Sequence, residues 1–185
     1  MDFVEGEILA FDKPYRWTSF DVVGKARWLL CHKLGVKKLK VGHSCTLDPL
    51  ATGVVVVCTG KKTKLIDQLQ AHQKEYVATL QLGATTPSFD LEKEIDATYP
   101  TEHITRALIE EVIPTFVGEQ WQVPPMFSAV KVDGKRAYKL ARKGEEVELK
   151  PKLLVIDEIE ILDFVKASMQ LTIRVVCSKG TYIRA

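Results

Sequence analysis

The sequence predicts an α+β fold with a mixed, mostly antiparallel central sheet flanked by helices and loops. Polar and apolar residues alternate over 74–83, 151–164 and 169–184, which is the period of strands. Only a few residues join the last two segments, and this predicts an antiparallel hairpin. Apolar residues recur at helical spacing over 19–33 and 101–113. A chain of 185 residues with 46% hydrophobic content is expected to form one domain, residues 1–185.

The composition excludes several classes of protein. The net charge of +2 is too small to identify a partner, so local clusters of charge matter more. The four cysteines have no paired spacing, which argues against both a zinc site and a disulfide framework and favours reduced thiols in the cytoplasm. No apolar stretch reaches membrane-spanning length, and the N-terminus lacks the pattern of a signal peptide.

The first elements are a short strand and a helix. An apolar run over 6–11 predicts a strand that Asp12, Lys13 and Pro14 interrupt. The hydroxyls and the acid of residues 18–21 predict the start of the helix over 19–33. Gly35 suits the end of this helix.

The stretch Val41–Gly53 predicts a stiff loop that presents one carboxylate. Pro49 keeps Asp48 out of helical geometry, and the β-branched run over 54–58 predicts a buried strand directly after the loop. A carboxylate on a loop beside a rigid strand is a common catalytic arrangement. The alternative is an ordinary Asp-Pro turn.

Basic residues cluster on both sides of this loop. Residues 32–40 hold four lysines and a histidine, which favours either a phosphate contact or a solvated loop. A second short helix is predicted from Thr59 onward, and its lysines could contact a polyanion.

The middle of the chain predicts a strand, a polar loop and a helix. In the strand over 74–83, one face carries Tyr76, Ala78 and Leu80. Tyr76 is either a packed aromatic or a platform that stacks on a base. The loop spans 84–100, and the inner stripe of the helix over 101–113 is predicted to be Ile104, Leu108 and Val112, with Pro114 as its end.

The last third combines a basic segment with the hairpin. Basic residues and Tyr138 alternate over 136–143, which suits a nucleic-acid contact, an amphipathic helix or both. The last strand is expected to run to Arg184, which would put Tyr182 and Arg184 on one face.

Several of these stretches resemble one family, the TruB-type tRNA pseudouridine-55 synthases of the stand-alone bacterial type. Residues 42–53 resemble the catalytic motif of that family, and further similar stretches follow in the family's order. These are Asp12-Lys13-Pro14, Lys74-Glu-Tyr-Val77, Val123-Pro-Pro-Met-Phe-Ser-Ala-Val-Lys131 and Cys177-Ser-Lys-Gly-Thr-Tyr-Ile-Arg184.

The chain departs from the family pattern in three places. Phe127 stands where the family usually has Tyr, and residues 85–90 differ from the usual pattern although Asp90 remains. The chain stops one residue past Arg184, so it is expected to lack the C-terminal portion of the catalytic domain and any PUA domain.

The resemblance implies the pseudouridine-synthase catalytic fold and the isomerisation of uridine 55 in the T-loop of tRNA. It implies that Asp48, Tyr76 and Arg184 are catalytic and that the uridine flips out of its stack. It implies substrate contacts at His43, Tyr182, Lys13, Lys74 and Lys131. It also implies a mobile thumb that grips RNA, at about 124–152.

The reaction changes no oxidation state, so neither a cofactor nor a metal is expected. The partner implied is the T stem-loop of tRNA, and a cytoplasmic monomer that needs neither a protein partner nor a membrane is expected. The alternative function is a non-catalytic module that binds or folds tRNA. The acid at Asp48 disfavours this alternative because a carboxylate repels phosphate.

Overall fold

The computed structural model describes residues 1–128, 130–132, 134–141 and 148–185. They form two compact units, Met1–His72 and Gln73–Ala185. The expectation of one catalytic domain stays a prediction. The combination of helices with antiparallel sheets confirms the predicted α+β class.

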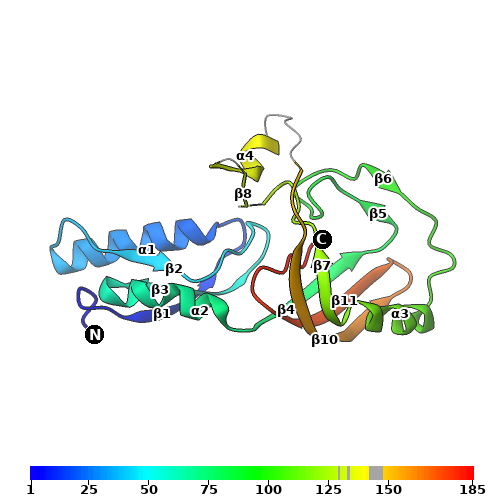
Figure 1. The fold of residues 1–185 in the computed structure, drawn as a ribbon, viewed down its shortest axis with the longest axis horizontal. Helices are drawn as coiled ribbons and strands as arrows, with labels where there is room; N and C mark the ends of the chain where they lie inside the picture. The colour runs from blue at the N-terminus through cyan, green and yellow to red at the C-terminus, as the bar shows by residue number, and fades with distance from the viewer. Residues whose placement is uncertain (129, 133, 142–147) are drawn as a thin grey trace. The chain divides into compact units, whose positions relative to one another are not determined.

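The first unit is a three-stranded antiparallel sheet with helices (Figure 1). Its strand order is β1-β3-β2, so β3 is central. The strands are β1 (Ile8–Lys13), β2 (Val41–His43) and β3 (Gly53–Thr59), and the helices are α1 (Ser19–Leu34), the 3-10 helix η1 (Gly60–Leu65) and α2 (Ile66–Ala71). Strand β1 runs through Lys13, past the break predicted at Asp12.

Helix α1 begins and ends as the sequence predicts. The Thr18 hydroxyl accepts a hydrogen bond from the Asp21 N–H, and the Asp21 carboxylate accepts one from the Thr18 N–H, which is a capping box. Gly35 ends the helix in the left-handed conformation, with φ of 65°. The inner face of α1 places Val22 and Val23 in a core with Val55 and Val57 of β3.

The second unit is built on a four-stranded antiparallel sheet with the order β4-β11-β10-β7. The strands are β4 (Lys74–Gln81), β7 (Gly118–Gln122), β10 (Lys152–Val165) and β11 (Gln170–Cys177). The smaller elements are β5 (Ala84–Thr85), β6 (Ala97–Thr98), α3 (Arg106–Val112), the 3-10 helix η2 (Ile113–Phe116), β8 (Lys131–Val132), β9 (Lys135–Arg136) and α4 (Ala137–Ala141). The hairpin of β10 and β11 confirms the prediction from alternation.

Two details of the second unit differ from the predictions. In α3, Ile109 is the buried residue, Leu108 is half-buried and Val112 is exposed, so the predicted inner stripe is wrong at Val112. The helix begins after Thr105, later than expected, and a short helix has too few turns to define its inner face from spacing alone.

Strand β11 ends at Cys177, and residues 178–185 form turns and irregular backbone. Tyr182 and Arg184 therefore do not lie on a strand, and the prediction that they share a strand face is wrong. Gly180, with φ of 86°, adopts a conformation that most residues resist and that a strand does not contain.

Candidate functional site

The Asp48 loop, residues 44–52, connects β2 to the central strand β3. The two strands pair antiparallel up to His43 and Val57, and the Ser44 N–H then donates to the Val56 carbonyl at 2.9 Å. Asp48 is half-buried, and its carbonyl accepts from the Ala51 N–H at 3.0 Å. Residues 48–51 therefore form a tight turn within the loop, directly before β3, and this turn presents one carboxylate.

Lys13 lies beneath this loop at the end of β1. Its side chain is fully buried, and its ammonium donates to the carbonyls of Pro14, Trp17 and Pro49. Burial lowers the pKa of Lys13, while attraction to Asp48 and Asp21 opposes that shift. Lys13 thus supports the residue after Asp48, and its predicted contact with substrate stays a prediction.

Three further hydrogen bonds hold the Asp48 loop. The Ser19 hydroxyl, which is buried at the start of α1, accepts from the Leu47 N–H at 2.9 Å. The Arg16 N–H donates to the Pro49 carbonyl at 2.8 Å. His43 bonds through its Nδ1 to the Cys45 carbonyl. The roles of Ser19 and Arg16 were missed from the sequence, because the partners lie about thirty residues away along the chain.

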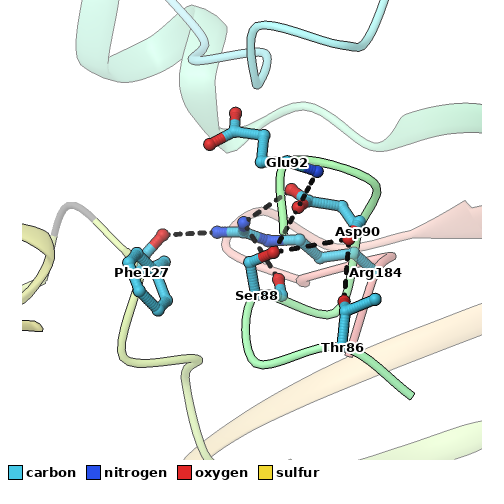
Figure 2. Close-up of polar contacts among 6 residues, drawn as sticks. All are labelled: Thr86, Ser88, Asp90, Glu92, Phe127 and Arg184. Carbon is cyan, nitrogen blue, oxygen red and sulfur yellow. Dashed lines mark hydrogen bonds and ion pairs between the residues drawn. The ribbon is translucent and has the colours of Figure 1, made fainter. Parts of the chain in front are cut away.

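In the second unit, Arg184 is enclosed by a polar loop (Figure 2). Its Nη1 donates to Asp90 Oδ2 at 3.0 Å and to the Ser88 carbonyl at 3.3 Å. Its Nη2 donates to the Phe127 carbonyl. The side chains of Arg184 and Asp90 are only 12% and 15% exposed, so their ion pair is largely removed from water.

Asp90 is held as firmly as the arginine that it binds. Its Oδ1 accepts from the Ser88 hydroxyl at 2.6 Å and from the Glu92 N–H at 3.0 Å, and its carbonyl accepts from the Thr86 hydroxyl at 2.7 Å (Figure 2). Asp90 remains where residues 85–90 depart from the family pattern, but the sequence alone predicted no role for it. The sequence feature that could have indicated a role for Asp90 was a carboxylate in a loop rich in hydroxyl residues. The same residue types are also typical of an ordinary turn.

The departure at Phe127 does not remove the contact with Arg184. That contact uses the Phe127 backbone carbonyl, which a tyrosine would present equally well. The Phe127 ring instead lies 5.7 Å from the Lys93 ammonium, a cation–π contact.

The other predicted residues of the second unit lie on the sheet or next to it. Lys74 and Tyr76 are half-buried on one face of β4, which confirms the face predicted for Tyr76. The Gln122 amide holds Tyr182 by its backbone, donating to its carbonyl at 3.0 Å and accepting from its N–H at 2.9 Å. The Lys131 side chain is outside the residues that the structure describes, as are residues 129, 133 and 142–147 of the predicted thumb.

The predicted site residues fall into two groups. The first unit contains Asp48, His43 and Lys13, and the second unit contains Tyr76, Lys74, Tyr182 and Arg184. An ion pair between Asp48 and Arg184 would join the groups, and it stays a prediction. Within the described ranges, no three His, Cys, Asp or Glu side chains are grouped as a metal site requires. Among the described residues, none of the helices combines the length and the apolar composition that spanning a membrane requires.

Comparison with known families gives a match over most of the chain. Residues 32–183 match the family described as "TruB family pseudouridylate synthase (N terminal domain)". The chain is 70% identical over 185 residues to a protein of Phocaeicola vulgatus named "tRNA pseudouridine synthase B", and it covers 78% of that protein. It is 52% identical to the protein of the same name from Flavobacterium johnsoniae, of which it covers 80%.

Solved structures share the fold. The chain superposes with a TM-score of 0.67 and 27% identity on a chain of the "Crystal Structure of a Cbf5-Nop10-Gar1 Complex". The match covers 98% of this chain and 42% of the solved one. A second structure, titled "Structure of H/ACA RNP bound to a substrate RNA containing 2'-deoxyuridine", matches with a TM-score of 0.62 at 24% identity, which supports the fold alone.

Proposed function

Because this chain belongs to the TruB family of pseudouridylate synthases, we propose that it isomerises the T-loop uridine of tRNA, position 55, to pseudouridine. The identity of 70% to tRNA pseudouridine synthase B over the whole chain supports an isomerase that acts on tRNA. The T-loop position and the mechanism are the finer parts of the proposal. We expect it to act as a cytoplasmic monomer without a cofactor.

The reaction breaks the bond between N1 of the base and C1′ of the ribose, turns the base and forms a bond from C5 to C1′. Positive character develops at C1′ as the base leaves, so a carboxylate at that position stabilises the change. In our proposal Asp48 is this carboxylate. It either attacks C1′ or removes a nearby proton.

The observation that carries this proposal is the way the Asp48 loop is held. Lys13 and the Arg16 N–H both bind the Pro49 carbonyl, and Ser19 binds the N–H of Leu47, so the residues on either side of Asp48 are pinned. Catalytic groups gain most when they are positioned before substrate arrives. An ordinary surface turn has no need of a fully buried lysine beneath it.

Residues of the second unit supply the other proposed roles. Arg184 would be the cationic partner of the ionised carboxylate, since an acid in a closed pocket needs one. Its orientation by Asp90, Ser88 and Phe127 supports a fixed position for that charge. Tyr76 would lie against the flipped base and take part in proton transfer at C5. Flipping costs roughly a few kcal/mol, which stacking on an aromatic ring helps to offset.

The remaining predicted residues would bind RNA. His43 would occupy space that the flipped base leaves, and Tyr182 would line the pocket. Lys13, Lys74 and Lys131 would contact the substrate, and the thumb at about 124–152 would grip the RNA backbone. For Lys13 the buried ammonium supports a positioning role more directly than a contact with RNA.

Tritium release from tRNA that carries 5-tritiated uridine tests the proposal, because C5 loses its hydrogen only when the new bond forms. We expect release with the unaltered chain and a loss on the order of 10⁴-fold or more with Asp48→Asn. Asp67→Asn, an exposed acid on α2, is the matched control and should retain activity. Full activity in Asp48→Asn would refute the role of Asp48.

The same assay, combined with a measurement of tRNA binding, distinguishes the isomerase from the second candidate function. A module that only binds or folds tRNA would bind the tRNA and release no tritium at any concentration. Failure of the unaltered chain to release tritium, together with tight tRNA binding, would therefore favour that alternative.

A further inference from the structure

The outer face of α1 carries exposed aromatic rings that the proposed chemistry does not use. Trp28 and Phe20 are 59% and 65% exposed. The core of the first unit uses the other face of the helix, through Val22 and Val23. Large aromatic side chains left in water on one face of a helix indicate a contact surface, since their burial against a partner would be favourable.

Two basic side chains contact the Trp28 ring. Its ring lies parallel to the His32 ring, with centroids 5.7 Å apart and an angle of 3° between the planes. The Lys25 ammonium lies 5.1 Å from the Trp28 ring centroid. We call these three residues the α1 ladder. A cation next to a flat ring is the combination that binds a base and its phosphate together.

A surface hollow adjoins the α1 ladder through Lys25. Its volume is about 550 Å³, and it is lined by Arg16, Trp17, Phe20, Asp21, Gly24 and Lys25. A Cβ added at Gly24 would meet no atom within 4 Å, so the space above this turn of the helix is open. Phe20 and Trp28 are eight residues apart, which places them roughly 12 Å apart along the helix axis. Phe20 and Gly24 line the hollow, and Trp28 follows one helical turn after Gly24.

The positive charges around this surface favour the binding of a polyanion. Arg16 and Lys25 line the hollow, and exposed lysines follow at Lys33, Lys37, Lys38 and Lys40. The carboxylate among them, Asp21, accepts hydrogen bonds from the Thr18 N–H and hydroxyl at 2.8 and 2.6 Å. Its charge lies at the helix N-terminus, where the helix dipole stabilises it.

We propose that the α1 ladder and the adjoining hollow bind RNA, stacking unpaired bases of the tRNA while the lysines contact its phosphates. This inference rests on the proposed function, since it takes tRNA as the substrate. It adds a contact that acts on affinity and plays no part in the chemistry at Asp48. Bases stack on aromatic side chains without regard to sequence, so the surface would strengthen binding to many tRNAs.

The test is the affinity of the 185-residue chain for a fluorescent tRNA transcript, measured by anisotropy. Trp28→Ala should raise the Kd by roughly 5- to 150-fold, the range for loss of one stacked base. Trp121→Ala removes an equally large exposed ring from β7 and should leave the Kd unchanged. Lys25→Ala should reduce the slope of log K against log salt by about 1, the loss of one phosphate contact. The rate of tritium release at saturating tRNA should stay the same in all three variants.

The outcomes distinguish this inference from the proposed function. If the unaltered chain releases tritium and Trp28→Ala binds tRNA as tightly as Trp121→Ala, only the inference fails. If the unaltered chain neither binds tRNA nor releases tritium, both fail. If Trp28→Ala abolishes self-association in sedimentation experiments while the Kd for tRNA is unchanged, the surface is a protein interface and the inference is overturned. Because Trp28 is exposed, its removal should leave the thermal unfolding curve unchanged, and this checks the fold.

Discussion

Replacing Asp90 with asparagine should destabilise the chain although the two side chains have nearly the same shape. Asp90 uses both carboxylate oxygens: Oδ2 accepts from Arg184, and Oδ1 accepts from the Ser88 hydroxyl and the Glu92 N–H. An asparagine has one oxygen and one donor group. If its amide nitrogen faces Arg184, two donors meet, and if it faces Glu92, the N–H there loses its acceptor.

The magnitude follows from burial. The two side chains are 12% and 15% exposed, so solvent does little to compensate the guanidinium when the carboxylate is gone. Removing one partner of a buried pair costs about 3–5 kcal/mol. Arg184 keeps its bonds to the carbonyls of Ser88 and Phe127, so we take the lower end, about 3 kcal/mol. That is a large part of the roughly 5–15 kcal/mol by which folded proteins are stable.

Urea unfolding followed by far-UV circular dichroism measures this effect. With a slope of about 2 kcal/mol per molar urea, a loss of about 3 kcal/mol lowers the midpoint by about 1.5 M. Asp96→Asn is the matched control, because Asp96 lies in the same loop and is exposed. It accepts a hydrogen bond from the Thr85 hydroxyl at 2.7 Å, and its loss should cost less than about 1 kcal/mol.

The double variant with Arg184→Met shows whether the ion pair is the cause. Once the guanidinium is absent, Asp90→Asn should cost much less than it does alone, a coupling of about 1–3 kcal/mol. A midpoint shift in Asp90→Asn no larger than in Asp96→Asn would refute the reasoning, as would additive effects in the double variant.

Two further predictions concern buried groups. Lys13→Met nearly preserves the length of the side chain but removes the donor to the Pro49 carbonyl. Because Asp48 would then be displaced, the rate of tritium release at saturating tRNA should fall by about 100-fold. An unchanged rate would contradict the positioning role of Lys13. Burial raises the pKa of the Cys177 thiol above its ordinary value of 9.0, so its contribution to stability is complete below pH 9.0 and is lost as the pH rises through the folded pKa. Stability measured from pH 8 to 11 should therefore decline less steeply in Cys177→Ala, and equal slopes would count against this cause.

Local patterns in the sequence predicted much of the fold. The capping box at Thr18 and Asp21, the helical spacing that follows and Gly35 define α1 to within a residue of the observed helix. Alternation identified β4, and with it the face that carries Tyr76. These features depend only on residues within one or two helical turns, or on the two-residue period of a strand. A single sequence is therefore sufficient to predict them.

Predictions from the sequence were wrong where no local pattern determines the outcome. Ile109 faces inward in α3 in place of Val112, because tertiary packing decides which side of a short helix is covered. The chain leaves β11 at Cys177, seven residues before Arg184, because the turn at Gly180 redirects it. Strand β7 carries no clear alternation, and its pairing with β10 is visible only in the folded chain.

Taken alone, the sequence determined the α+β class, the resemblance to the TruB family and the choice of Asp48 as the acid on the loop before β3. Only the tertiary structure decided what holds the proposed site residues. It placed the Lys13 ammonium under Pro49, 36 residues along the chain, and it joined Arg184 to Asp90 across 94 residues. Spacing along a chain reports which residues share a face of one element, whereas contacts between elements form only when the elements pack together.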